Sequence, residues 1–290
     1  MSTAERRAAF ATQIRAREFT LVPGVYDMVS ARVADRAGFD ALYMSGYGIS
    51  ASHLGLPDAG LSSFTDMLDR ARTIAAGTAT PLVADADTGF GGLVNVRHTV
   101  QGYEAAGVAA IQLEDQDFPK KCGHAAGRTV IPAAEMVTKV EVAVDSRADD
   151  DFLVIARTDA RSSLGIDEAI KRGRAYAAAG ADVVFVESPE SEHEFARIVD
   201  EIDAPVVANM VEGGFSPALP AERLAELDVT IGLFPVTALL AVTARLDGIY
   251  RRLRTDGTSP EPGDAMWSIA DMHSLMGLDD VQTFEDHWTE

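Results

Sequence analysis

The chain has 290 residues, of which 47% are hydrophobic and 24% are charged, and its 45 acidic and 25 basic residues give a net charge of −20. This excess of acid argues against nucleic acid and anionic membranes as partners. No apolar run reaches about 20 residues, the length that spans a bilayer, and no signal peptide is evident, so we expect a cytoplasmic protein. The single cysteine excludes an intrachain disulfide and a cysteine-rich zinc site.

Short apolar runs alternate with helical stretches along the chain, which predicts repeated strand–helix units. The predicted strands are 21–25, 41–44, 82–84, 110–113, 152–156, 183–186, 205–208 and 230–233. Helical periodicity is clear at 64–76, 95–106, 133–145, 166–179 and 220–226. Gly38, Gly107 and Gly180 each follow a helical stretch and precede a strand, as helix C-cap glycines do.

Eight such units predict an α/β fold, a (β/α)₈ TIM barrel, over residues 1–254. A doubly wound sheet is the alternative, but the segment after the first strand, 23–27, lacks the glycine-rich phosphate turn of that fold. After a predicted helix at 238–254 and a linker at 255–263, residues 255–290 form an extension. It contains Trp267, Met272, Met276 and Trp288, and we expect it to lie at the subunit interface of a homo-oligomer.

Polar residues stand at nearly every predicted strand end, and in a barrel these ends surround the active site. Asp85 and Asp87 point to the same side of an extended chain. Together with Glu114 they form an oxygen-rich set suited to Mg²⁺, whereas solvated loop acids with a helix cap at Thr88 are the alternative reading. The strand-end residues are Ser45, Gly46, Asp85, Asp87, Glu114, Arg157, Asp159, Glu187, Asn209, Glu212 and Phe234.

Cys122 is flanked by Lys121 and His124. A cation and an imidazole next to a thiol lower its pKa and suit it to acid or nucleophilic chemistry, although a lone cysteine is often a small buried hydrophobe. Arg157 follows a buried strand and needs an acidic partner, for which a substrate carboxylate or Glu187 would serve; a structural ion pair is equally compatible. Ser45 and Gly46 could hold an anionic oxygen or simply form a turn.

These motifs resemble those of the isocitrate lyase/phosphoenolpyruvate mutase superfamily. The similar segments are Asp85–Gly91, the metal motif; Glu114–Gln116, the second acidic segment; Lys120–His124, the gating loop of the lyase branch; and the blocks 156–160 and 209–214. The segments Ser45–Gly48 and Asn209–Gly214 depart from the 2-methylisocitrate lyase pattern and favour 2,3-dimethylmalate or 2-alkylmalate lyases.

The resemblance implies a Mg²⁺-dependent (or Mn²⁺-dependent) carbon–carbon lyase that cleaves a 2-hydroxy di- or tricarboxylate to a 2-oxo acid such as pyruvate. It implies metal ligands Asp85, Asp87 and Glu114; catalytic residues Cys122, Lys121, His124, Arg157, Glu187, Tyr43 and Asp58; and substrate-binding residues Ser45, Gly46, Gly123, Asn209 and Glu212. Cys122 would protonate the carbanion that forms when the carbon–carbon bond breaks. The resemblance also implies a C-terminal helix exchanged between subunits, and from the apolar residues of 255–290 we expect the homo-oligomer to be a tetramer. Oxaloacetate hydrolysis, phosphonate chemistry and a non-catalytic barrel remain alternatives.

Overall fold

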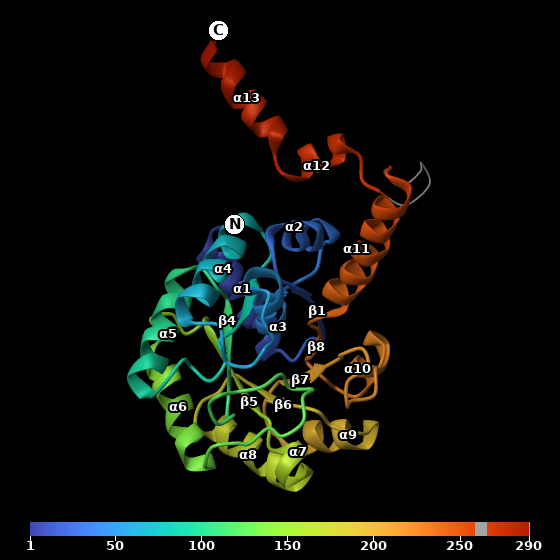
Figure 1. The fold of residues 1–290 in the computed structure, drawn as a ribbon. Helices are drawn as coiled ribbons and strands as arrows, with labels where there is room; N and C mark the ends of the chain where they lie inside the picture. Colours follow the sequence, from blue (N-terminus) through green and yellow to red (C-terminus); the bar gives the residue numbers. More distant parts are fainter. Residues whose placement is uncertain (259–265, 290) are drawn as a thin grey trace. The chain divides into compact units, whose positions relative to one another are not determined.

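The eight predicted strands form one closed parallel barrel, which confirms the predicted fold (Figure 1). A computed structural model of the chain describes residues 1–258 and 266–289. Each strand pairs with its sequence neighbours, and the last strand pairs with the first, so the sheet has no free edge. The strands are β1 (Thr20–Val25), β2 (Leu42–Met44), β3 (Leu82–Asp85), β4 (Ala110–Glu114), β5 (Leu153–Thr158), β6 (Val183–Val186), β7 (Val206–Asn209) and β8 (Ile231–Phe234).

Several strands run slightly further than the sequence pattern indicated, and this places charged residues inside the sheet. β3 ends at Asp85 and β4 at Glu114, while β5 continues to Thr158 and so includes Arg157. Glu114 and Arg157 are register partners on neighbouring strands. The polar positions therefore start within the hydrogen-bonded barrel, which holds their backbones more firmly than loops would.

Helices follow the strands around the outside of the barrel (Figure 1). α2 ends on Gly38 in the left-handed conformation, and Gly107 and Gly180 also have positive φ, as expected of helix C-cap glycines. The helices are α1 (Thr3–Arg15), α2 (Met28–Ala37), α3 (Gly46–Ile49), the π-helical turn η1 (Ser50–Leu54), α4 (Phe64–Gly77), α5 (Leu93–Ala105), α6 (Ala133–Ser146), α7 (Arg161–Leu164), α8 (Ile166–Ala178), α9 (Glu192–Glu201), α10 (Ala221–Glu226), α11 (Thr237–Asp256), α12 (Ile269–Leu275) and α13 (Leu278–Thr289).

Helix α1 was not predicted, and it packs against the barrel interior. Its Phe10 and Ile14 belong to the same buried cluster as strand residues such as Leu153 and Val183. Its Arg7 donates to the carbonyl of Val108, just before β4. A second buried cluster fills the space between the strands and the surrounding helices. The barrel is thus a packed core and not a pore, as is usual for this architecture.

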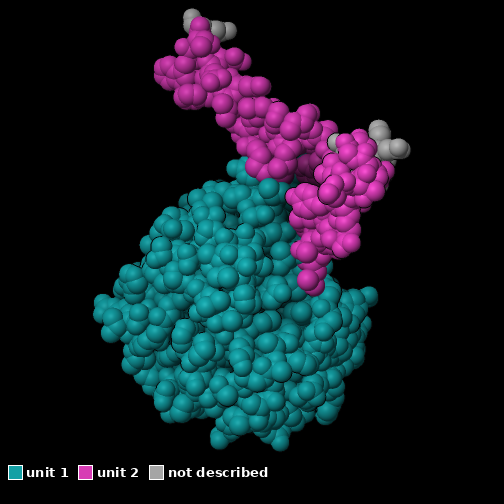
Figure 2. Space-filling view, in the orientation of Figure 1, with its two compact units in different colours: residues 1–239 teal, residues 240–290 magenta. Residues whose placement is uncertain are grey.

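The chain divides into two compact units, Met1–Leu239 and Leu240–Glu290 (Figure 2). The division falls inside α11, whereas the sequence pattern suggested a boundary after Arg254. The linker expected at 255–263 begins within α11, which runs to Asp256, and its part from residue 259 onward lies outside the described residues. In the second unit, α11 to α13 expose many large apolar side chains. None of the described helices is long and apolar enough to cross a membrane.

Candidate active site

The strand-end acids Asp85, Asp87 and Glu114 are almost fully buried, with exposed fractions of 6%, 5% and 2%. The reading of these residues as solvated loop acids is therefore wrong. Asp85 Oδ1 accepts hydrogen bonds from the backbone N–H of Asp87 at 3.0 Å and from Gln112 Nε2 at 3.4 Å. Burial raises the pKa of all three carboxyl groups, that of Asp87 to about 7. Such clustering of buried acids is typical of a functional site.

Lys120 provides the compensating positive charge. Its Nζ lies 2.5 Å from Asp58 Oδ1 and 2.6 Å from Asp87 Oδ1, and its side chain is buried. Burial opposes the charged form, but the surrounding carboxylates of Asp87, Glu114 and Asp85 hold the pKa of Lys120 well above its ordinary value. Lys120 therefore remains an ammonium group inside the acidic cluster.

The chemistry of the cluster fits a hard dication that completes its coordination with oxygens from outside the protein. In the part of the chain that the structure describes, no group of three or more acidic, histidine or cysteine side chains is arranged as a complete ligand set. Glu114 Oε1 is buried without a hydrogen-bond partner. Mg²⁺ typically binds through one or two carboxylates plus waters and substrate oxygens. These all-oxygen donors therefore fit Mg²⁺ better than zinc.

The expectation of a low thiol pKa at Cys122 is wrong. Burial raises the pKa of the Cys122 thiol. The charges of Asp58 and Glu187 act in the same direction, whereas a hydrogen bond from the His124 backbone N–H and the charge of Arg157 only partly oppose it. The flanking Lys121 does not help, because it is exposed and its Nζ donates to the carbonyl of Gly127 at 2.8 Å. The thiol is thus kept protonated, which suits a proton donor better than a nucleophile.

Arg157 has the acidic partners that its position in β5 requires. It donates to both carboxylate oxygens of Asp159, at 2.8 and 2.9 Å, and its NH1 lies 3.2 Å from Glu187 Oε2. Its Nε also lies 3.5 Å from Glu114 Oε2. Asn209 Nδ2 donates to Glu187 Oε2 at 3.0 Å. The ends of β4, β5, β6 and β7 are therefore joined by one buried network of ion pairs and hydrogen bonds.

The loop that carries Cys122 is fastened over this network. The backbone N–H of Cys122 donates to the Asp58 carbonyl at 3.0 Å, and Ser188 Oγ donates to the Gly123 carbonyl at 3.0 Å. His124 accepts from the Phe215 N–H at Nδ1, which leaves Nε2 to carry the proton, 3.3 Å from Glu187 Oε1. A β-carbon on Gly123 would clash with Arg157 NH2, so the loop contacts the network closely.

The other predicted site residues are distributed as follows. The Tyr43 hydroxyl is buried and donates to Gln112 Oε1 at 2.7 Å, which links it indirectly to Asp85. Gly46 lies against Asp85, and a β-carbon at this glycine would clash with Asp85 Oδ2. Ser45 Oγ accepts the Gly48 N–H at 3.2 Å as the cap of α3. Glu212 is exposed and accepts from Thr237, so it does not join the buried network.

The sequence reasoning did not assign roles to several residues of the network. Lys120 rather than Lys121 faces the acids, and the choice between two adjacent lysines depends on the loop conformation. Arg128, which bonds Asp159 at 2.6 Å, and Ser188, which bonds Glu187 and Gly123, were also missed. Arg128 carried no clear signal in the sequence, because a loop arginine can equally be solvated, as the nearby Lys121 is.

Buried acids, a buried lysine and a protonated thiol at the carboxyl end of a (β/α)₈ barrel define a barrel enzyme. The family model for phosphoenolpyruvate phosphomutase matches residues 10–252. The chain is 47% identical over 272 residues to 2,3-dimethylmalate lyase of Eubacterium barkeri, covering 94% of each chain.

Two solved structures share the fold over nearly their whole length. Oxaloacetate acetylhydrolase in complex with 3,3-difluorooxalacetate superposes with a TM-score of 0.93 at 36% identity, covering 99% of this chain and 97% of that one. Phosphonopyruvate hydrolase in complex with oxalate and Mg²⁺ superposes with a TM-score of 0.88 at 31% identity, covering 100% of both. The chain belongs to the phosphoenolpyruvate mutase/isocitrate lyase superfamily, and it is a lyase of that superfamily.

Proposed function

We propose that the enzyme cleaves the C2–C3 bond of a 2-hydroxy dicarboxylate of the 2,3-dimethylmalate or 2-alkylmalate type and releases a 2-oxo acid such as pyruvate. The observation that carries this proposal is the Cys122 thiol, which burial keeps protonated beside the Arg157–Glu187 network. The 47% identity to a dimethylmalate lyase supports the substrate class. 2-Methylisocitrate is the tricarboxylate alternative.

In this reaction a buried carboxylate removes the proton of the substrate's 2-hydroxyl group, and Asp58 is our candidate. The C2–C3 bond then breaks, and its electron pair stays on C3 as a carboxylate-stabilised carbanion. Cys122 gives its proton to C3, which completes the second carboxylate product. Before the next turnover the protonated Asp58 releases its proton to water and the thiolate takes one up, so that both groups return to their starting states. His124 and Glu187 position the loop that holds the thiol.

When bound, Mg²⁺ (or Mn²⁺) held by Asp85, Asp87 and Glu114 would supply Lewis-acid stabilisation of the oxygen that becomes the 2-oxo group. The oxygen-only donor set and the unpaired Glu114 Oε1 support this assignment. Lys120 adds a fixed positive charge at the same place. Arg157 and the backbone at Ser45 and Gly46 are candidates for holding substrate carboxylates, together with Gly123 and Asn209. Lys121 and Glu212 lie outside the buried network and are the weakest of the predicted site residues.

Oxaloacetate hydrolysis is the second candidate, because the fold superposes on oxaloacetate acetylhydrolase with a TM-score of 0.93. A panel assay separates the two. The protein is incubated with Mg²⁺ and with 2,3-dimethylmalate, 2-alkylmalates, 2-methylisocitrate, oxaloacetate or phosphonopyruvate, and the 2-oxo acid, oxalate and phosphate products are quantified. We expect a 2-oxo acid from a malate derivative. Oxalate from oxaloacetate as the fastest reaction would overturn the lyase proposal for this chain.

A further inference from the structure

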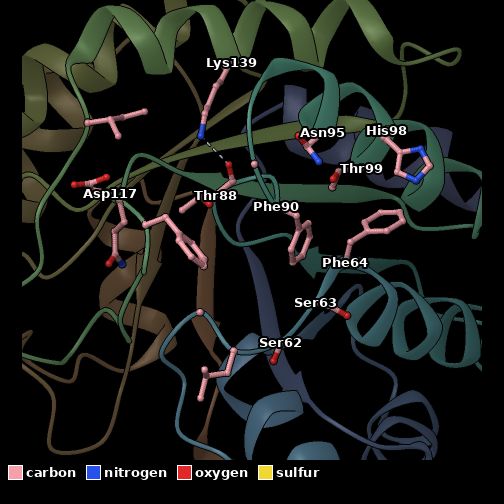
Figure 3. Close-up of a pocket in the computed structure, with 16 residues that line it drawn as sticks. Ser62, Ser63, Phe64, Thr88, Phe90, Asn95, His98, Thr99, Asp117 and Lys139 are labelled. Atoms are coloured by element: carbon pink, nitrogen blue, oxygen red, sulfur yellow. Dashed lines mark hydrogen bonds between the residues drawn. The ribbon is translucent and has the colours of Figure 1, made fainter.

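A second cavity lies beside the candidate active site, between α4, α5, α6 and the loops after β3 and β4 (Figure 3). Its volume is about 630 Å³, within the range of small-molecule sites. None of the residues to which we assign a part in the reaction lines it. The lining includes Phe64, Phe90, Phe118, His98, Lys139 and Thr88.

Lys139 lies at one end of this cavity, and not all of its hydrogen-bond donors have a partner. Lys139 Nζ donates one hydrogen bond, to the Thr88 carbonyl at 3.0 Å. Within residues 1–258 and 266–289, Lys139 forms no ion pair, whereas Lys120 pairs with two acids and Lys171 with Glu168. An ammonium group has three donors, so two are left for a ligand. Lys139 is half-buried, and this burial lowers its pKa, although the exposed carboxylate of Glu135, four residues earlier in α6, acts in the opposite direction.

Three phenylalanines and His98 form an aromatic part of the lining, beside small and polar residues such as Ser63 and Asn95. Phe64 and Phe90 meet edge to face with ring centroids 5.8 Å apart, and His98 lies against Phe64 at 4.7 Å (Figure 3). Such ring faces and edges favour a flat apolar group. Asp117 also lines the cavity, but it is exposed to solvent. The cavity thus combines the ammonium group of Lys139 with a cluster of aromatic rings.

We propose that this cavity is a second binding site, which takes a small carboxylate with an aromatic or branched apolar body, the carboxylate on Lys139 and the body against Phe64 and Phe90. The carboxylate of the ligand forms an ion pair with Lys139, which has no such pair within the described residues. The apolar body covers ring surface that water otherwise contacts. The site is independent of which reaction the enzyme catalyses.

Calorimetric titration of the full-length protein with 3-phenylpropionate tests this proposal. We expect saturable binding at one site per chain, weakened about tenfold or more for 3-phenylpropanol, which lacks the charge, and for propionate, which lacks the ring. Lys139→Met should weaken 3-phenylpropionate binding to a similar extent, and Lys139→Arg should retain it. Lys171→Met is the matched control, because Lys171 is exposed and does not line the cavity. The Lys171→Met protein should bind 3-phenylpropionate as tightly as the unsubstituted protein does.

Three outcomes would overturn the proposal. These are no saturable binding up to about 10 mM, equal binding by the Lys139→Met and unsubstituted proteins, or loss of binding when oxalate and Mg²⁺ are present in excess, which would place the ligand in the active site. Thermal melting of the Lys139→Met protein shows whether it is folded. If it is not, the Lys139→Arg protein decides the test, since it keeps the positive charge and should still bind 3-phenylpropionate.

Discussion

Lys120 Nζ lies 2.6 Å from Asp87 Oδ1, and both side chains are buried. Removing one partner of such a pair leaves an uncompensated buried charge, which is far more costly than the pair itself. The contact also ties the Cys122 loop to the end of β3. The same ion pair therefore helps to hold the Cys122 loop in place and to neutralise the negative charge of the acidic cluster.

Replacement of Asp85 should stop the reaction without unfolding the protein. Asp85→Ala removes a carboxylate at a strand end, and we expect turnover to fall at least about 100-fold, since metal-ion stabilisation contributes several kcal/mol. Initial rates of 2-oxo acid release and thermal melting measure the two effects. The unsubstituted enzyme should lose activity in EDTA and regain it with Mg²⁺. Full activity after exhaustive EDTA treatment would exclude the metal-dependent mechanism.

Cys122→Ser should lower kcat with little change in substrate Kd. A hydroxyl is nearly the same size as a thiol but a much weaker acid, and general acid catalysis typically contributes about 10²–10⁴-fold. We therefore expect kcat to fall about 100-fold or more, measured by steady-state kinetics, with Kd from calorimetry. A serine variant with a near-normal kcat would reject the proton-donor role.

Gly123→Ala should prevent the loop from closing. A β-carbon at this position would clash with Arg157 NH2 and lie 2.8 Å from Glu187, so the loop or the network has to move. We expect kcat/KM to fall by about 10²-fold, the effect of misplacing catalytic groups by roughly 1 Å. Gly92→Ala is the matched control, because its β-carbon would meet nothing within 4 Å. Equal kinetics for the two variants would show that the contact with Arg157 is unimportant.

Asp115 should be important for stability. Its carboxylate is fully buried and accepts hydrogen bonds from Thr158 Oγ1, Arg172 NH1 and Tyr176 OH, at 2.7, 2.9 and 2.7 Å. Asp115→Ala removes the buried partner of Arg172, which keeps only the partly exposed Glu168 as an acidic partner, at 3.2 Å, and it leaves the hydroxyls of Thr158 and Tyr176 without their acceptor. Breaking a buried pair in this way costs about 3–5 kcal/mol. We expect Tm to fall by roughly 5–10 °C. The neighbouring Asp117 is exposed, and Asp117→Ala should leave Tm almost unchanged; equal shifts for both variants would contradict the argument.

The C-terminal unit should hold an oligomer together, which we propose is a homotetramer. Phe284 and Trp288 on α13 are 66% and 72% exposed, and large exposed apolar surfaces mark interfaces. Multi-angle light scattering at micromolar concentration should give a multiple of the 30.9 kDa chain mass. Phe284→Asp combined with Trp288→Asp should shift the mass downward. A monomeric unsubstituted protein would rule this out, as would an unchanged mass in the double variant.

The barrel could be predicted from the sequence because its strands are short apolar runs separated by helical periodicity. The acids at Asp85, Asp87 and Glu114 could be located because strand ends meet at one rim. The role of Lys120 could not, since neither pattern nor charge distinguishes it from Lys121. The pKa of Cys122 was predicted in the wrong direction because it depends on burial, and sequence neighbours do not report how much water a folded loop excludes.

Helix α1 helps to keep water away from the acidic cluster, although it lies at the other end of the barrel. Phe10 and Ile14 pack into the interior of the barrel, and Arg7 binds the carbonyl of Val108, just before β4. This packing helps to exclude water at the amino-terminal end of the strands, and the Cys122 loop covers the carboxyl end. The low polarity that raises the pKa of Asp87 is therefore maintained from both ends of the barrel. Shortening the N-terminus should change the acid–base behaviour of the distant catalytic groups before it changes their positions.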